Sequence, residues 1–485
     1  MAAQTFFFYD LETSGVNPRS ARIMQFAGQR TSLDLQPIGE PVNVLIKLSP
    51  DIVPEPDAIM VTGITPQQTL QDGITEAEFL KLFYDEVATP GTIFLGYNTV
   101  RFDDEFMRFL MYRNFYDPYE WQWKDGRSRW DLLDVVRMTR ALRPEGIKWP
   151  VDSNGKPTNR LELLTAVNGL DHIDAHDALS DVKATIALAQ LLRKKQPKLF
   201  DYLLDMRDKK KAATLVMEGK PFVYSSGKYS SEYEKTAVVQ LVATHPTKQN
   251  AYVYDLRYDP AQYKDYTPEQ LVEAWRWKKD STELRLPVKA IRFNTCPAIA
   301  PLSVLDEKSQ ERLKINLDEV RAHAKTLASM KGWPQKLLKA VEILDEAQQA
   351  SFLSDQIIVD AQLYDGFFDD HDRSLENAFR AASPDELTGF IDEFHDPRLQ
   401  ALVPLYKARN FPDNLQDEER VAWEKHIQQS LMQGGTSSKL AKYFKRLEQL
   451  ADDPRLTQNK RYLLEELQLY GQSIMPVSDE YESAA

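Results

Sequence analysis

The sequence predicts an α/β domain at the N-terminus, followed by a small β domain and then an all-helical region. Three observations lead to this fold class. The first part of the chain combines an apolar strand pattern with amphipathic helical patterns, short strand-like segments follow Pro221, and segments rich in Leu, Ala, Glu and Lys follow Pro301. A chain of 485 residues is also too long for one hydrophobic core.

The first predicted element is a strand that ends at two carboxylates. The apolar run 5–9 predicts a buried strand, and Asp10 and Glu12 follow it directly. Because strand side chains alternate between faces, residues two apart point to the same side. We therefore expect both carboxylates to face one point.

Two predicted helices add further acids. Apolar residues at helical spacing trace a helix that begins near Asp103, and a second such pattern places Asp181 in the first turns of another helix, just after His176. Each acid alone is typical of a solvated strand end or of a charge favoured at a helix start, and a lone histidine is typical of a surface. Their joint occurrence favours a functional site.

Four carboxylates at one point repel one another, by roughly 4 kcal/mol for each pair about 4 Å apart at an effective dielectric constant near 20. The pattern therefore predicts bound cations, and all-oxygen ligands suit Mg²⁺, for which Mn²⁺ can substitute. Two ions about 3.5–4 Å apart can stabilise the attacking and the leaving oxygen of a phosphodiester. A histidine with a pKa near 6.5, such as His176, suits the general base that deprotonates the attacking water.

The charge distribution bears on nucleic-acid binding. A net charge of −13 argues against it, because phosphate contacts call for a basic surface. Residues 101–160, however, contain 12 Lys or Arg and 10 Asp or Glu, interleaved with many aromatic residues. Cations that follow phosphates and rings that stack on bases are what a single-strand groove needs. Of these rings, Phe115, Tyr116 and Trp130 fit a hydrophobic core better.

Composition excludes several other classes. The single Cys296 excludes an internal disulfide and predicts a buried thiol in a reducing compartment. No Cys and His spacing is typical of zinc, and no Gly-rich phosphate loop implies ATP. The chain shows neither a secretion signal pattern nor an apolar span of membrane length. We expect a cytoplasmic protein that does not enter a membrane.

Domain edges follow from changes in pattern. A basic run before Pro197 predicts the end of the first domain, and the charged stretch 205–211 is expected to be the tail of a connecting helix. Strands of the second domain are expected at 237–242, 251–256 and 287–293. We place the three domains at 1–196, 197–350 and 351–485.

The acidic motifs resemble those of the DEDD superfamily of 3′→5′ exonucleases, in the branch with a His-x-x-x-x-Asp motif. The residues that match its four metal-binding acids and its base are Asp10, Glu12, Asp103, Asp181 and His176. The resemblance implies a ribonuclease H-like fold with a mixed five-stranded sheet. It also implies two Mg²⁺ ions at the site.

Longer strings resemble the bacterial exonuclease I family. They lie at 96–105, 112–119, 128–134, 141–147, 196–203, 360–368 and 408–412. The resemblance implies an SH3-like second domain and a helical region that arches over the first. It further implies metal-dependent 3′→5′ hydrolysis of single-stranded DNA to 5′-mononucleotides, processively, in DNA repair and recombination.

The same resemblance suggests binding residues. Those that look like contacts to single-stranded DNA are Glu12, Arg108, Tyr119, Trp123, Arg137 and Arg160. Those that look like a docking surface for the acidic tail of single-strand DNA-binding protein are Arg143, Tyr202 and Arg312. We expect a monomer. Two alternatives stay open: a 3′→5′ RNA exonuclease with the same catalytic residues, and a non-catalytic single-strand-binding scaffold.

Overall fold

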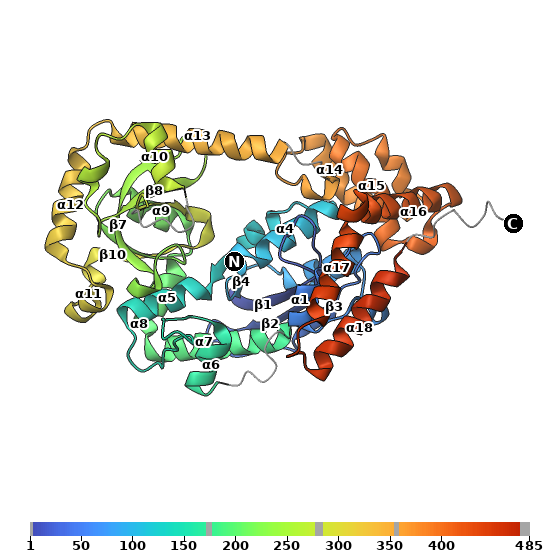
Figure 1. The fold of residues 1–485 in the computed structure, drawn as a ribbon, viewed down its shortest axis with the longest axis horizontal. Coiled ribbons are helices and arrows are strands. Elements are labelled where there is room, and N and C mark those ends of the chain that lie inside the picture. The colour runs from blue at the N-terminus through green and yellow to red at the C-terminus, as the bar shows by residue number, and fades with distance from the viewer. Residues whose placement is uncertain (1–2, 171–176, 277–284, 354–357, 476–485) are drawn as a thin grey trace.

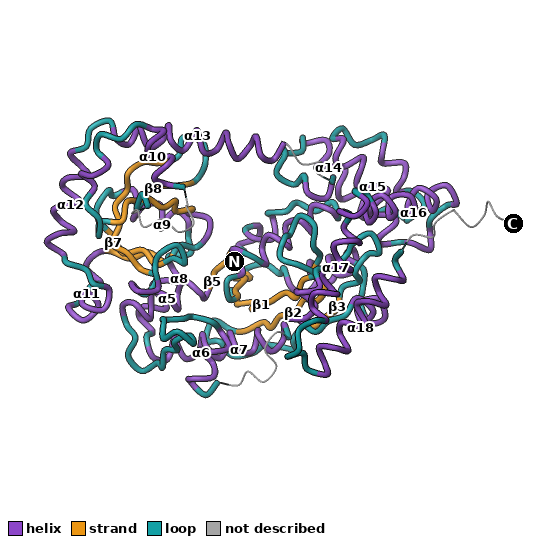
Figure 2. Tube along the Cα trace, viewed as in Figure 1, coloured by secondary structure: helices purple, strands orange, loops and turns teal. Residues whose placement is uncertain are grey.

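The computed structural model describes residues 3–170, 177–276, 285–353 and 358–475. Its parts follow one another along the chain as a mixed α/β domain, a β domain and a helical region (Figure 1). Figure 2 shows the strands in two separate groups, one in each of the first two domains. No helix in the described part of the chain is long and apolar enough to span a membrane.

The N-terminal domain is built on a mixed five-stranded sheet with the order β3-β2-β1-β4-β5. Its strands are β1 (Thr5–Thr13), β2 (Ile23–Thr31), β3 (Val42–Leu45), β4 (Thr92–Gly96) and β5 (Ser128–Asp131). β1 pairs antiparallel with β2 and parallel with β4. Because β1 has neighbours on both edges, it sits in the middle of the sheet, which explains its almost unbroken apolar run.

Helices cover this sheet. They are α1 (Pro56–Thr62), α2 (Pro66–Asp72), α3 (Glu76–Leu82), α4 (Asp103–Arg113), α5 (Leu132–Leu142), α6 (Leu161–Asn168) and α7 (Ala178–Lys195). The apolar face of α7 packs on β1 and β2. The predicted strand at 5–9 and the helices at Asp103 and Asp181 are therefore present. The strand continues to Thr13, however, so Asp10 and Glu12 lie within β1 and do not follow it.

The second domain contains a five-stranded antiparallel sheet with the order β10-β6-β7-β8-β9. Its strands are β6 (Phe222–Ser225), β7 (Thr236–Thr244), β8 (Asn250–Asp255), β9 (Val288–Arg292) and β10 (Ala298–Pro301), and its helices are α8 (Pro197–Asp205), α9 (Lys209–Met217) and α10 (Pro268–Trp275). The expectation for 205–211 was wrong: α8 ends at Asp205 and Asp208 caps the start of α9. The charged residues therefore mark a junction between two helices.

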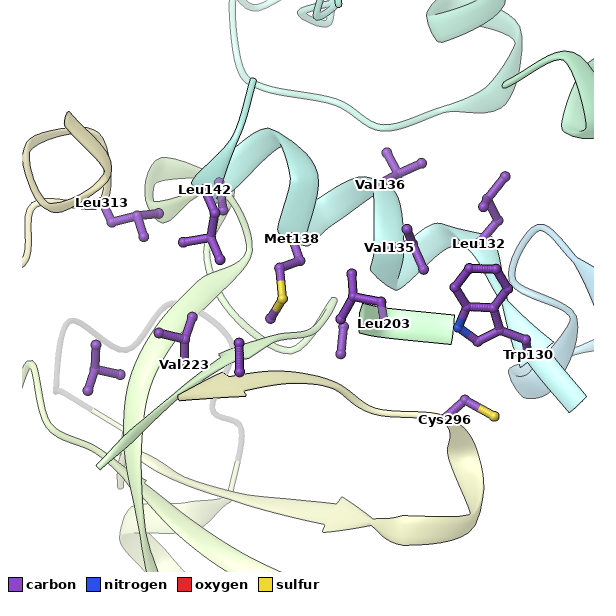
Figure 3. Close-up of a cluster of buried hydrophobic side chains, with 14 of the residues drawn as sticks. Trp130, Leu132, Val135, Val136, Met138, Leu142, Leu203, Val223, Cys296 and Leu313 are labelled. Carbon is purple, nitrogen blue, oxygen red and sulfur yellow. The ribbon is translucent and has the colours of Figure 1, made fainter. Parts of the chain in front are cut away.

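One hydrophobic core joins the first two domains. Figure 3 shows Met138 and Leu142 of α5 directed toward the β domain, where Val223 of β6 is fully buried. Trp130 and Cys296 lie at the other end of this cluster. The Cys296 thiol donates to the Arg129 carbonyl, and burial raises its pKa to about 12. As predicted, this cysteine is buried.

The helical region begins after β10. Its helices are α11 (Glu307–Leu313), α12 (Leu317–Ser329), α13 (Trp333–Leu353), α14 (Asp370–Ala381), α15 (Pro397–Asn410), α16 (Asp417–Met432), α17 (Lys439–Ala451) and α18 (Gln458–Ser473). α11, α12 and the start of α13 pack beside the β domain, and α13 runs from there toward α14 (Figure 1). At 1.5 Å per residue, its 21 residues span about 30 Å.

The last five helices pack against the first domain. Phe115 at the end of α4 contacts Phe379 of α14 and Tyr406 of α15, with ring centroids 4.0 and 5.5 Å apart. On another face, Ile59 and Met60 of α1 share a core with α17 and α18. The chain therefore leaves the first domain, passes through the β domain and returns to the first domain.

Candidate active site

Three carboxylates converge at the centre of the N-terminal sheet. Asp10 and Glu12 project from β1, and Asp181 projects from the first turn of α7. Each offers an oxygen, and these oxygens lie within 4.8 Å of one another. The convergence follows from the alternation of side chains along β1 and from the packing of α7 across that strand.

A hydrogen bond anchors the start of α7 to the sheet. Glu12 lies opposite Gln25 in the register of β1 and β2, and the Gln25 side-chain amide donates to the Asp177 carboxylate at 3.2 Å. The other Asp177 oxygen accepts from the Ser180 amide at 3.0 Å and caps α7. Sequence analysis missed Asp177. Its signal was an aspartate just before an apolar helical pattern, as is typical of an N-cap.

Asp103 is the first residue of α4, as predicted. The turn that leads to it is held by the Asp131 carboxylate, which accepts from the amides of Asn98 at 3.1 Å and Val100 at 3.2 Å. The same carboxylate accepts from the Leu133 amide at 2.9 Å and caps α5. Asp131 thus couples two helix starts, a role that sequence analysis did not assign.

The turn between β4 and α4 requires particular residues. A Cβ atom on Gly96 would lie 2.1 Å from Thr99 Cγ2 and 2.7 Å from the Tyr9 carbonyl oxygen, so only glycine fits. Asn98 has φ of 75°, in the left-handed region that asparagine tolerates better than most residues. The string at 96–105 therefore reflects backbone geometry as well as chemistry.

Behind the site, a second acid ties α4 to the sheet. The Tyr9 hydroxyl donates to Asp104 Oδ1 at 2.5 Å, and Arg129 of β5 forms an ion pair with the same carboxylate. Asp104 is 1 % exposed. These contacts neutralise Asp104 and leave the neighbouring Asp103 to face the three converging carboxylates.

The electrostatics show an excess of negative charge. Burial raises the pKa of the Asp10 carboxyl well above its ordinary value, and the charges of Asp103 and Asp181 raise it further. Burial likewise raises the pKa of Glu12 to about 9, with Asp10 and Asp181 as the next causes. The pKa of Asp103 is also raised, first by burial. A bound cation would relieve this repulsion.

The expected base, His176, lies outside the described residues. The next residue along the chain is Asp177, which Gln25 and Ser180 hold beside Asp10 and Glu12.

Arg108 of α4 contacts the segment that carries Tyr119 and Trp123. The Arg108 guanidinium is 5.6 Å from the centre of the Tyr119 ring and donates to Gln122, the neighbour of Trp123. Arg108 also pairs with Glu105, which accepts a hydrogen bond from Tyr364 of the helical region at 2.5 Å. The Trp123 side chain is 62 % exposed. Two parts of the chain therefore contribute to this surface.

Arg137 and Arg160 lie elsewhere. Arg137 and Arg101 both pair with Asp134, and a Cβ on Gly227 of the β domain would lie 3.0 Å from an Arg137 nitrogen. Arg137 therefore faces the junction with the β domain. Arg160 precedes α6 and is exposed, and its guanidinium pairs with Glu162.

Arg143 and Arg312 occupy the junction of α5 and α11. Arg143 donates to the Val304 carbonyl at 2.9 Å, and Arg312 donates to the Ala141 carbonyl at 2.6 Å. Tyr202 lies on α8, which also packs against α5, and its hydroxyl has no partner among the described residues. Arg143 thus caps the end of α5, and Arg312 and Tyr202 lie on helices that contact α5.

Comparisons with known proteins agree with this architecture. Family models match in order an exonuclease domain at residues 7–189, the exonuclease I SH3-like domain at 207–342 and the exonuclease I C-terminal domain at 358–474. Exodeoxyribonuclease I of Escherichia coli (strain K12) is 40 % identical over 478 residues, which cover 97 % of this chain and 98 % of that protein. The chain belongs to the exonuclease I family.

Solved exonuclease I structures have the same fold. The enzyme from Methylocaldum szegediense, described as moderately thermophilic, superposes with a TM-score of 0.90 at 42 % identity and covers 98 % of this chain and 100 % of its own. E. coli exonuclease I in complex with a dA16 oligonucleotide superposes with a TM-score of 0.89 at 38 % identity, covering 97 % and 100 %. A structure described as SSB/exonuclease I in complex with an inhibitor gives 0.86 at 37 % identity, covering 98 % and 100 %.

These matches confirm the predicted fold class. The first domain is ribonuclease H-like, the second is SH3-like, and the rest of this exonuclease I family member is helical.

Proposed function

We propose that this chain is a metal-dependent 3′→5′ exonuclease that releases 5′-mononucleotides from single-stranded DNA. The observation that carries the proposal is the convergence of oxygens of Asp10, Glu12 and Asp181 within 4.8 Å of one another, with the Asp103 charge acting on Asp10. A purely structural cluster of acids would be neutralised by basic partners, as Asp104 is by Arg129. The raised pKa values of Asp10 and Glu12 indicate that cations complete this site.

The donor set fits hard divalent cations. Asp10, Glu12, Asp103 and Asp181 offer carboxylate oxygens and no nitrogen or sulfur, which is the set that Mg²⁺ prefers. We assign two Mg²⁺ ions to these residues, with Mn²⁺ as a substitute. When bound, such a pair lowers the pKa of water and stabilises charge on the phosphodiester oxygens.

The side chains of the protein have separate roles in hydrolysis. The His176 imidazole accepts the proton of the attacking water, since histidine is half protonated near neutral pH. Asp177 and Gln25 hold the start of α7, and so position Asp181. Asp131 holds the turn that positions Asp103. Glu12 also contacts the terminal nucleotide.

We propose that single-stranded DNA contacts the surface formed by Arg108, Tyr119 and Trp123, and also Arg137 and Arg160. Arg108 supplies positive charge beside the rings of Tyr119 and Trp123, which suits phosphates and stacked bases. Arg137, at the junction with the β domain, and Arg160, just before α6, would contact other parts of the strand. The chain returns to this domain through α13 and the last five helices, an arrangement that would help to hold a strand between cuts, and we therefore propose that hydrolysis is processive.

DNA is favoured over RNA because a relative of this chain has been crystallised with a dA16 oligonucleotide. The catalytic carboxylates alone do not distinguish the two, since through bound cations they would act on the phosphodiester that DNA and RNA share. A non-catalytic scaffold is disfavoured because a cluster of four carboxylates repels a polyanion unless cations are bound. We place the activity in DNA repair and recombination.

The test is mononucleotide release from single-stranded DNA labelled at either end, with Mg²⁺ or with EDTA. Matched RNA and duplex DNA serve as the other substrates. Loss of label from the 3′ end of single-stranded DNA, abolished by EDTA and by Asp10→Asn, supports the proposal. Preference for RNA overturns the substrate, and failure of every strand to react supports the scaffold.

We further propose that Arg143, Tyr202 and Arg312 bind the acidic, apolar-ended tail of single-strand DNA-binding protein. The two guanidinium groups lie at the junction of α5 and α11 and suit a carboxylate-rich peptide, and Tyr202 lies on α8, which also contacts α5 and could meet the apolar end of the peptide. A synthetic tail peptide should bind the protein, and Arg312→Glu should weaken it without changing hydrolysis of bare single-stranded DNA. Equal binding by the variant would contradict this assignment.

The remaining expectations are also proposals. We propose domain boundaries at 1–196, 197–350 and 351–485, the second of which falls near the end of α13. We propose that the protein is a monomer, which light scattering during gel filtration tests.

A further inference from the structure

A second cluster of metal-ligand residues lies in the helical region, apart from the carboxylate site. His371 and Asp372 are in the first turn of α14, and His395 lies just before α15. Each offers a ligand atom, and these atoms lie within 4.8 Å of one another. The two imidazole rings are stacked, with centroids 4.1 Å apart and planes 15° apart. Because residues 371 and 395 are distant in sequence, ligand spacing along the chain does not reveal this cluster.

Each histidine has one ring nitrogen held by an oxygen. His371 Nε2 lies 3.1 Å from the Glu393 carbonyl, which can only accept, so that nitrogen carries the proton. His395 Nδ1 lies 3.0 Å from Asp369 Oδ2. In the neutral rings, the lone pairs are therefore on His371 Nδ1 and His395 Nε2. An oxygen bonded to the opposite ring nitrogen is typical of histidines that bind metals.

The Asp372 carboxylate is already oriented. It is 1 % exposed, and its oxygens accept from the backbone amides of His395 at 2.7 Å and Asp396 at 2.9 Å. These bonds hold the backbone of His395 against the start of α14. Two bonds leave further lone pairs on the carboxylate oxygens. The third ligand is thus fixed by the same contacts that bring the two histidines together.

We propose that His371, Asp372 and His395 form a zinc-class site that joins the start of α14 to the segment before α15. Two imidazoles and one carboxylate are a frequent zinc ligand set, whereas Mg²⁺ prefers oxygen alone. Imidazole lone pairs lie in the ring plane, so one ring leaves the stack when the ion binds. The His395 side chain is 63 % exposed, so its ring can tilt about the Nδ1 contact with Asp369. The site is independent of the proposed nuclease activity.

The experiment is a titration of the full-length protein with Zn²⁺, and with Co²⁺ as a visible-absorption probe. The parent protein carries Asp10→Asn and Asp181→Asn, so that the carboxylate site does not compete. One equivalent of Zn²⁺ should bind and displace Co²⁺, and excess Mg²⁺ should not displace it. His371→Ala and His395→Ala should each weaken binding at least tenfold, and Asp369→Asn about tenfold, as for loss of an outer hydrogen-bond partner.

The control is His323→Gln on α12, because His323 also contacts a backbone carbonyl, that of Leu256. It should leave the Zn²⁺ affinity unchanged. Circular dichroism in EDTA confirms that each variant is folded, and His371→Gln replaces the alanine variant if that one unfolds. Zn²⁺ binding that is absent, or that survives loss of both histidines, overturns the proposal.

Discussion

Arg409 of α15 and Asp51 of the N-terminal domain form a buried ion pair, with 2.6 Å between Nη2 and Oδ2. Their side chains are 8 % and 2 % exposed. Arg409 also contacts Asp360, which in turn pairs with Arg22 at 2.6 Å. Charged residues of the N-terminal domain and of the helical region thus neutralise one another where these two parts of the chain meet.

Asp360→Ala should lower the free energy of unfolding by about 3–5 kcal/mol, because it leaves two buried guanidinium groups without this partner. Urea denaturation followed by circular dichroism measures the loss. Asp57→Asn is the matched control, since the Asp57 pair with Arg446 is largely exposed and should contribute little. If both variants lower the free energy of unfolding by the same amount, burial of the Asp360 ion pairs does not determine their contribution.

The metal-free protein should become less stable as the pH rises from about 4.5 to about 9. Burial raises the pKa of Glu12 from 4.5 to about 9, so the folded state holds this proton more tightly than the unfolded chain and is penalised when the proton leaves. Thermal unfolding in EDTA at several pH values tests this. Glu12→Gln should reduce the slope, whereas Glu40→Gln, at an exposed position, should not. If the pH dependence of the melting temperature is unchanged by Glu12→Gln, Glu12 is not the group responsible.

Asp131→Ala should reduce kcat by roughly 100-fold, because misplacement of a catalytic group by about 1 Å has effects of this size. The carboxylate contacts no proposed metal and acts through the turn between Asn98 and Val100. Mg²⁺-dependent turnover is the readout. Asp131→Asn, which keeps one acceptor oxygen, should recover part of the rate. If the alanine variant is fully active, Asp131 does not position Asp103.

Trp123→Ala should weaken binding of single-stranded DNA by about 1–3 kcal/mol and leave the melting temperature unchanged, because this ring is exposed and suited to stacking on a base. Fluorescence anisotropy with EDTA present separates binding from cleavage. Its neighbour Trp121 is fully buried, so Trp121→Ala should instead destabilise the protein by about 3–5 kcal/mol. Tyr462→Ala, at an exposed position on α18, is the control for loss of a surface ring.

Sequence periodicity was sufficient to predict the elements that carry the acids. β1, α4 and α7 have long or strongly apolar patterns, so their type and approximate start could be predicted. The four-residue strands β6 and β10 are too short for a clear alternation, and they were missed. The roles of Asp131 and Asp177 depend on backbone amides from other elements, which a linear pattern does not contain. The histidine cluster arises from tertiary packing alone.

The ion pair between Arg22 and Asp360 also has a consequence for biosynthesis, because these residues are 338 positions apart. Domains generally fold in the order in which they leave the ribosome. The residues of the N-terminal sheet are therefore all synthesised while Asp360 and Arg409 are still untranslated, and Arg22 and Asp51 lack these two partners until the helical region has been made. A nascent or truncated chain that stops before Asp360 lacks these buried contacts. The first domain therefore acquires its full set of buried ion pairs only after the helices that carry Asp360 and Arg409 have been translated.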